Sequence, residues 1–132
     1  MNQKMENLTI LIVDDDELSR RLLLKVLEGC GVKNIVVAKN GSEAIEALTN
    51  AQTKINAVLS DIDMPVLDGW GFVSKIRLGA VPDYKNVPIY MMTARGSEEN
   101  EQKSRYKKVN GYALKPPRKD VISKILDEIL TA

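Results

Sequence analysis

The chain of 132 residues contains no histidine and a single cysteine, Cys30. Without histidine it cannot build a Ser–His or Cys–His catalytic pair, a histidine metal ligand or a phosphohistidine. One cysteine cannot form an internal disulfide, and alone it cannot complete a structural zinc site. The chemistry that remains is that of oxygen: carboxylates, hard cations and phosphate. The lone thiol fits a reducing compartment, so we expect a cytoplasmic protein.

Long apolar runs and a strong net charge are also missing. No run approaches the ~20 apolar residues that span a bilayer, and the polar residues 1–7 lack the apolar core of a signal peptide. A net charge of +1 gives no strong field for nucleic acid or a membrane surface. We therefore expect one globular domain over residues 8–130 after an N-terminal tail, residues 1–7, with neither nucleic acid nor membrane as a direct partner.

Short apolar runs alternate with helical patterns along the whole chain. The predicted strands are residues 8–13, 34–38, 57–60, 89–92 and 111–114. The predicted helices are residues 17–28, 43–48, a third from about 69, 96–108 and 119–130. This alternation predicts an α/β fold: a doubly wound, five-stranded parallel sheet with right-handed crossovers, flanked by five helices.

The fourth predicted helix, residues 96–108, is the weak one. Tyr106 is its only large apolar residue, although its acidic residues precede its basic ones, as the helix dipole prefers. Because a helix of this length depends on an apolar face to pack, we expect this segment to be short, frayed or mobile.

Distinctive polar residues follow four of the predicted strands. Asp14 and Asp15 follow the first strand, Asp61 the third, Thr93 the fourth and Lys115 the fifth. The carboxyl ends of parallel strands meet at one edge, so these side chains are expected to share a crevice. Three carboxylates there repel one another unless a cation joins them, and oxygen ligands suit Mg²⁺. Together with the ammonium group of a lysine, the carboxylates and a bound cation suit the transfer of a phosphoryl group to a carboxylate.

The acidic run Asp14-Asp15-Asp16 leaves two possible metal pairs, Asp14 with Asp15 or Asp15 with Asp16. A helix that starts at Glu17 favours an acidic N-cap. This argument favours Asp16 as the cap and Asp14 with Asp15 as the pair.

Five short motifs stand at characteristic spacing in this chain. They are Asp14-Asp15, Asp61 in Ser60-Asp61-Ile62-Asp63-Met64-Pro65, Asp68-Gly69, Thr93-Ala94 and Lys115-Pro116. Together they resemble the response-regulator receiver domains of two-component signalling, of the chemotaxis-regulator type, over about residues 9–130. The resemblance implies a flavodoxin-like strand order, 2-1-3-4-5. It also implies a signalling protein that catalyses only its own phosphorylation and dephosphorylation.

The resemblance implies a role for each matching residue. Asp61 would accept a phosphoryl group from the phosphohistidine of a sensor histidine kinase or a histidine phosphotransfer protein. Mg²⁺, with Mn²⁺ as a possible substitute, would be bound by Asp15 directly, by Asp14 mostly through water, by Asp61, and by the backbone carbonyl of Asp63.

The remaining implied roles concern switching. Thr93 would reach a phosphoryl oxygen, and Lys115 would be the counter-ion of the phosphoryl group. The Lys115–Pro116 bond would be cis. Tyr112 would be an aromatic residue that rotates inward when Thr93 moves toward the phosphate. A downstream protein would bind the face from the fourth strand to the last helix. Asp63 and Arg95 occupy variable positions that tune the lifetime of the phosphoaspartate, and we hypothesise that they pair across the mouth of the site.

An alternative function uses the same acidic residues. Asp61-Ile62-Asp63 resembles the D-x-D signature of haloacid-dehalogenase-type phosphatases, with Asp61 as nucleophile and Asp63 as general acid and base. That motif usually lies on the first strand, such enzymes need additional chain for a cap, and the alternative leaves Asp14-Asp15 without a role. Resemblance at the level of fold is weak support for function.

Overall fold

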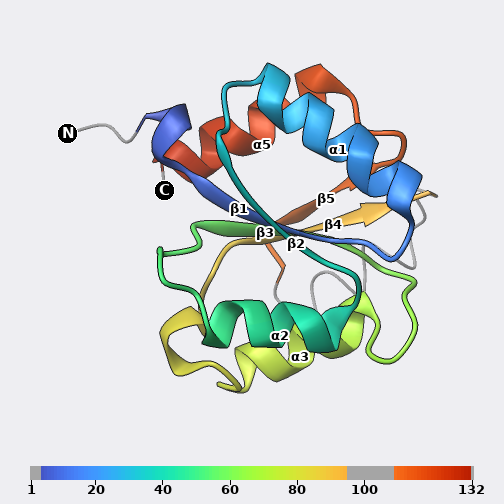
Figure 1. The fold of residues 1–132 in the computed structure, drawn as a ribbon, viewed down its shortest axis with the longest axis vertical. Helices are drawn as coiled ribbons and strands as arrows, with labels where there is room; N and C mark the ends of the chain where they lie inside the picture. The colour runs from blue at the N-terminus through green and yellow to red at the C-terminus, as the bar shows by residue number, and fades with distance from the viewer. Residues whose placement is uncertain (1–3, 95–108, 132) are drawn as a thin grey trace.

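Five parallel strands form one sheet in the order β2-β1-β3-β4-β5 (Figure 1). The computed structural model describes residues 4–94 and 109–131. The strands are β1 (Thr9–Val13), β2 (Asn34–Ala38), β3 (Ala57–Asp61), β4 (Ile89–Thr93) and β5 (Gly111–Leu114). All four neighbouring pairs are parallel. The observed order is the one expected from the sequence.

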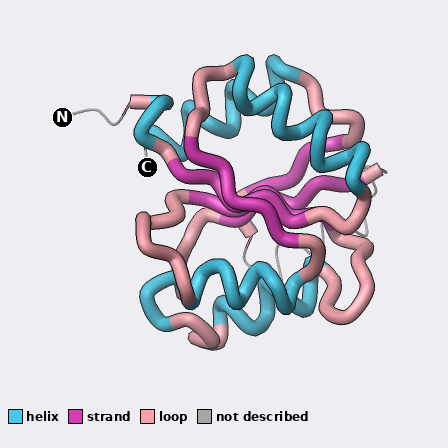
Figure 2. The backbone as a smooth tube through the Cα atoms, viewed as in Figure 1, coloured by secondary structure: helices cyan, strands magenta, loops and turns pink. Residues whose placement is uncertain are grey.

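Helices cover both faces of this sheet. One face carries α1 (Glu17–Gly29) and α5 (Lys119–Thr131), and the other carries α2 (Gly41–Thr49) and α3 (Gly69–Arg77) (Figures 1 and 2). The doubly wound α/β class is therefore confirmed. The described residues contain these four α-helices; the predicted fourth helix, 96–108, lies outside the described residues.

Strand β1, which lies between β2 and β3, contributes side chains to two separate hydrophobic cores. All five of its residues are buried. Leu11 and Val13 pack in the core under α2 and α3, whereas Ile10 and Ile12 pack in the core under α1 and α5. Alternate side chains of a strand point to opposite faces, so a continuous apolar run is what a strand covered on both sides requires.

Side-chain caps start three of the helices on the carboxyl edge of the sheet. Asp16 accepts from the Ser19 N–H at 3.1 Å, Asn40 from the Glu43 N–H at 2.9 Å, and Asp68 from the Gly71 N–H at 2.7 Å. A cap of this kind contributes about 1 kcal/mol. The expectation that Asp16 caps α1 is confirmed, and each cap fixes a loop that follows a strand.

The apolar residues of α1 do not all face the core. Leu23 and Leu27 are buried, but the side chains of Leu18 and Leu22 are 65% and 43% exposed. The helix contacts the sheet through a narrower stripe than its apolar residues would allow, which leaves Leu18 and Leu22 facing away from the core.

Thr9 offers a direct test of packing at the start of β1. The residue is 3% exposed, and in the described part of the chain its hydroxyl group has no hydrogen-bond partner. Thr9→Val keeps the shape and removes the unpaired hydroxyl, so the free energy of unfolding is expected to rise by about 1 kcal/mol. Urea denaturation measures this. The exposed Thr53→Val should change stability by less than about 0.5 kcal/mol, and a loss of stability in Thr9→Val would contradict the prediction.

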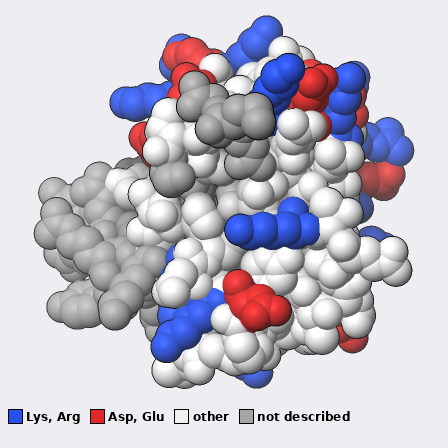
Figure 3. All heavy atoms as spheres, turned by 90° about the vertical axis from the view of Figure 1, so that its left-hand side faces the viewer, with Lys and Arg blue, Asp and Glu red and all other residues white. Residues whose placement is uncertain are grey.

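Figure 3 views the molecule from the edge where the strands begin. Over the described part of this face, acidic and basic side chains are both present and intermixed. The acidic cluster described next belongs to the opposite edge, where the strands end.

Candidate functional site

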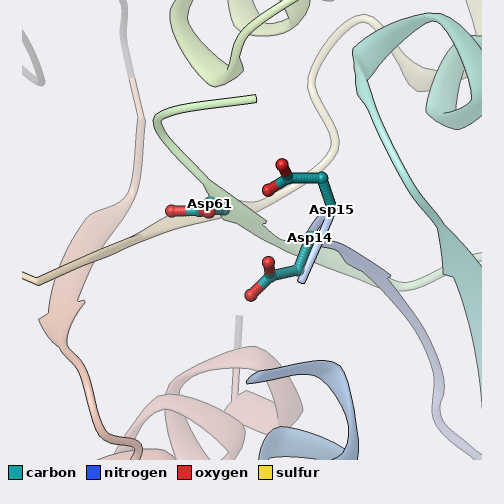
Figure 4. A group of neighbouring side chains, drawn as sticks. All are labelled: Asp14, Asp15 and Asp61. Carbon is teal, nitrogen blue, oxygen red and sulfur yellow. The ribbon is translucent and has the colours of Figure 1, made fainter. Parts of the chain in front are cut away.

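Three carboxylates meet at the carboxyl ends of β1 and β3 (Figure 4). Asp14 and Asp15 lie in the loop between β1 and α1, and Asp61 is the last residue of β3. One carboxylate oxygen from each lies within 4.8 Å of the others. Asp14 is buried, Asp61 is half-buried and Asp15 is exposed. The structure thus brings together the pair favoured by the capping argument, while Asp16 serves the helix.

Lys115 supplies the positive charge of the site. Its ammonium nitrogen lies 2.9 Å from Asp14 Oδ2 and 3.2 Å from Asp61 Oδ2. The Lys115 N–H donates to the Thr93 carbonyl at 2.7 Å, which places this residue directly beyond the β4–β5 ladder. The Lys115–Pro116 bond is cis, as expected. One ammonium group therefore bridges two carboxylates from different strands.

The charges shift one another's ionisation. Burial raises the pKa of the Asp61 carboxyl, Lys115 opposes that rise, and the nearby charge of Asp14 adds to it, with a net result above the ordinary value. Burial works to lower the pKa of Lys115, but its bonds to Asp14 and Asp61 outweigh burial and hold the pKa above the ordinary value. Ionising Asp61 in the folded protein therefore costs more free energy than ionising an ordinary aspartate, whereas Lys115 keeps its positive charge more strongly than an ordinary lysine.

This cost gives a stability prediction. In the ion-free protein at neutral pH, Asp61→Asn is expected to raise the free energy of unfolding by about 1 kcal/mol, a modest figure because water reaches this carboxylate. The folded-state pKa lies above the unfolded one, so wild-type stability falls as pH rises between the two values. The gain in free energy of unfolding of Asp61→Asn over wild type should be full above that interval of pH and vanish below the ordinary pKa of aspartate.

Urea denaturation in a chelator, from about pH 3 to about pH 8, measures this dependence. Asp83→Asn, an exposed carboxylate on the helical turn η2 (Pro82–Tyr84), is the control and should show no such gain. A variant that is less stable than wild type at neutral pH would contradict the prediction.

Asp14 is held by more contacts than the sequence suggested. Its Oδ1 accepts from the Asp16 N–H at 2.9 Å, and its Oδ2 accepts from the Ser19 hydroxyl at 2.5 Å. Its backbone carbonyl accepts from Arg20 Nη1 at 2.8 Å. The sequence pattern did not identify Ser19 or Arg20 as contacts of Asp14. Their position on the first turns of a helix that follows three acidic residues was the available signal.

The loop after β3 is tightly constrained. Val66 has a φ of 69°, and the Leu67 N–H donates to the Pro65 carbonyl at 2.8 Å, which together describe a γ-turn with positive φ. For a β-branched residue this backbone is strained. The Leu67 carbonyl accepts from the Gly41 N–H at 2.9 Å, so the start of α2 holds the loop in place.

The other predicted site residues lie as follows. Thr93, 6% exposed, ends β4 at the same edge of the sheet as Asp61. Tyr112 lies on β5, partly buried against the core under α2 and α3. Asp63 is exposed, and its carboxylate is not part of the acidic cluster found among the described residues. Arg95 lies outside the described residues, so its expected pairing with Asp63 is untested.

The donor set fits a small hard cation. Carboxylate oxygens from Asp14, Asp15 and Asp61 converge within one ion's reach, and such all-oxygen sites are typical of Mg²⁺ or Mn²⁺ rather than zinc. Two of the three side chains are already oriented by hydrogen bonds, because the Ile62 N–H donates to Asp61 Oδ1 at 2.8 Å and Asp14 is held as described. The acidic cluster is therefore chemically suited to a divalent ion.

The family model of the response regulator receiver domain matches residues 10–127. The chain belongs to the receiver domains of two-component signalling. The receiver domain is 33% identical over 122 residues to the chemotaxis protein CheY1 of Helicobacter pylori strain J99, covering 92% of this chain and 95% of the relative. It is also 31% identical over 107 residues to a part of the sensor histidine kinase CheAY of Helicobacter pylori, covering 81% of this chain and 13% of the kinase.

Solved structures agree with this assignment. The chemotaxis protein CheY4 of Vibrio cholerae matches the receiver domain with a TM-score of 0.82 and 29% identity, covering 93% of this chain and 98% of that one. No helix in the described parts of the receiver domain is long and apolar enough to cross a membrane. These similarities, with the acidic cluster, do not favour the phosphatase alternative based on Asp61 and Asp63.

Proposed function

We propose that Asp61 is the phosphoryl acceptor of this receiver domain. The observation that carries the proposal is the meeting of Asp61 with two further carboxylates and one ammonium group at the ends of β1, β3 and β5. Asp61 is the member of the cluster that contacts Lys115 and is also half-buried at a strand end. The acceptor therefore lies where a cation and a lysine can both reach the incoming phosphoryl group.

The proposed reaction is a direct transfer. A carboxylate oxygen of Asp61 attacks the phosphorus of a phosphohistidine on a partner protein, the new O–P bond forms as the P–N bond breaks, and the imidazole nitrogen leaves with the bonding pair and takes up a proton. Lys115 can turn from Asp61 toward the phosphoryl oxygens while it stays bonded to Asp14, and Thr93, at the end of β4, can donate its hydroxyl to one of those oxygens. The protein contributes mainly position and charge.

We propose that Asp14, Asp15 and Asp61, with the backbone carbonyl of Asp63, hold a Mg²⁺ ion for which Mn²⁺ can substitute. When bound, such an ion would supply positive charge that offsets the negative charge of the phosphoryl oxygens. Hydrogen bonds within the chain orient two of these carboxylates. The Ile62 N–H holds Asp61, and Lys115 holds Asp14. We propose that residues 8–130 form the receiver domain and that the reaction takes place in the cytoplasm.

The decisive experiment measures phosphoryl uptake from acetyl phosphate and from a phosphorylated histidine phosphotransfer protein, with Mg²⁺ present. Wild type should take up one phosphoryl group per chain, Asp61→Asn none, and the exposed Asp83→Asn as much as wild type. Repeated release of phosphate from esters, or uptake by Asp61→Asn equal to wild type, would refute the proposal.

The partners proposed upstream are a sensor histidine kinase or a histidine phosphotransfer protein, supported by the match to part of a sensor histidine kinase. Downstream, we propose a protein partner on the face formed by β4, β5 and α5. A hollow of about 320 Å³ there is lined by Tyr90, Tyr112 and Val121 among others. A shift of Tyr112 would reshape this hollow.

A fixed hydrogen bond borders that hollow. Tyr90 Oη donates to Glu128 Oε2 at 3.0 Å. Burial, together with the bond to Glu128 and its charge, raises the pKa of Tyr90 to about 12, so the phenol keeps its proton at neutral pH. This bond ties β4 to α5 and leaves Tyr112 as the aromatic residue proposed to move. Asp63 and Arg95 remain proposed regulators of phosphoaspartate lifetime.

A further inference from the structure

Asp14 is the most enclosed carboxylate of the acidic cluster and has an almost complete set of donors. It is 3% exposed. Its Oδ1 accepts one hydrogen bond, from the Asp16 N–H, and its Oδ2 accepts two, from the Ser19 hydroxyl and the Lys115 ammonium group. A carboxylate has about four acceptor positions. Donors from the described residues fill three of them, and the position they leave unfilled is on Oδ1.

Ser19 is itself held in place. Its backbone N–H donates to Asp16 Oδ2 at 3.1 Å, while its hydroxyl donates to Asp14 Oδ2 at 2.5 Å. It therefore connects two carboxylates of the acidic run from the first turn of α1. Arg20, the next residue, fixes the Asp14 backbone carbonyl at 2.8 Å. The side chain and the backbone of Asp14 are both held by the start of this helix.

We propose that Ser19 is a positioning residue that fixes the Asp14 carboxylate so that Oδ1 faces the divalent ion or its bound water. The inference rests on the proposed function, since it concerns the ion site of the same cluster. It adds a residue that touches neither the ion site's other ligands nor the phosphoryl acceptor in the described contacts, and acts through Asp14.

The physical reason lies in competition for Asp14. Ser19 and Lys115 both donate to Oδ2, which holds that oxygen on the lysine side, while Oδ1 accepts only the Asp16 N–H among the described residues and keeps one acceptor position unfilled. Without the hydroxyl, the Asp16 N–H is the described hydrogen bond that still opposes a rotation bringing both oxygens toward the ammonium group. Such a rotation turns the unfilled acceptor position away from the ion. Loss of a hydrogen bond that orients a metal ligand typically lowers metal affinity about 10- to 100-fold.

Manganese is a suitable probe because free and bound Mn²⁺ are counted separately by electron paramagnetic resonance. We expect the dissociation constant for Mn²⁺ to be about tenfold higher in Ser19→Ala than in wild type. Ser19→Thr keeps the hydroxyl and should remain within about threefold of wild type. Ser42→Ala, an exposed serine on the first turn of α2, is the matched control and should bind like wild type.

A structural readout separates positioning from folding. The ion-free thermal midpoint of Ser19→Ala should stay close to that of wild type, while the upward shift of the midpoint on adding Mn²⁺ should be smaller. Equal or tighter Mn²⁺ binding in Ser19→Ala, or an equal loss in Ser19→Thr, overturns the inference while phosphoryl uptake by wild type still supports the proposed function. A wild type that binds no Mn²⁺ and takes up no phosphoryl group overturns both.

Discussion

Adding one methyl group at Gly69 is expected to lower the free energy of unfolding by about 3 kcal/mol or more. A Cβ atom at this position would lie 2.3 Å from the Asp61 carbonyl oxygen, 2.6 Å from Met91 Cε and 3.0 Å from Ile62 Cα. The methionine can move, but two of these atoms belong to the backbone that carries the proposed acceptor. The Gly69 N–H also donates to the Ile62 carbonyl at 2.8 Å, so the helix cannot withdraw without losing that bond.

Chemical denaturation of Gly69→Ala against Gly29→Ala tests this. Gly29 is the last residue of α1, and a Cβ there would meet no atom within 4 Å, so this control should be neutral or gain up to about 1 kcal/mol. If Gly69→Ala does fold, its phosphoryl uptake should be reduced as well, because Asp61 must shift. A Gly69→Ala protein as stable as the Gly29→Ala control would show that the contact is softer than the geometry indicates.

Replacing Lys115 with methionine is expected to be the most damaging change of a single charge. The ion-free protein should lose about 3 kcal/mol, because a buried pair that loses one partner leaves an uncompensated charge, here on Asp14, whose side chain is 5% exposed. Added Mg²⁺ should restore much of that loss, since the divalent ion can take over the neutralising role. Phosphoryl uptake should fall sharply even with the ion present.

The comparison is a lysine in an open ion pair. Lys33 lies 3.7 Å from Glu6, with side chains 72% and 50% exposed, and Lys33→Met should change stability by less than about 0.5 kcal/mol with or without Mg²⁺. Denaturation of both variants in a chelator and in Mg²⁺ gives the four values needed. If Mg²⁺ stabilised the Lys115 variant no more than wild type, the ammonium group and the ion would not share a role.

The sequence predicted the site's position well because strand ends are easy to locate. Asp61 follows an apolar run too short for a helix, and Lys115 follows another, so parallel pairing alone brings them to one edge. The capping preference also resolved the acidic run, since Asp16 does cap α1 and Asp14 does lie with Asp61. These are local rules, and the pattern of residues is sufficient to apply them.

What the sequence did not reveal depends on side-chain rotation and on three-dimensional spacing. The Ser19–Asp14 bond requires one rotamer on the first turn of a helix, and no periodicity reports it. The positive φ at Val66 falls on a residue that disfavours it, so propensity predicts the opposite. The exposure of Leu18 depends on how α1 is rotated on the sheet, which apolar spacing fixes only approximately.

The separation of Asp14 from Lys115 by 101 positions along the chain has a consequence for biosynthesis. A nascent polypeptide that has emerged as far as β4, but not β5, contains the three carboxylates before the ammonium group that later lies between two of them. Until β5 has emerged, Lys115 cannot offset the repulsion among these carboxylates, so the charge pairing of the site is among the last contacts that synthesis of the domain makes possible.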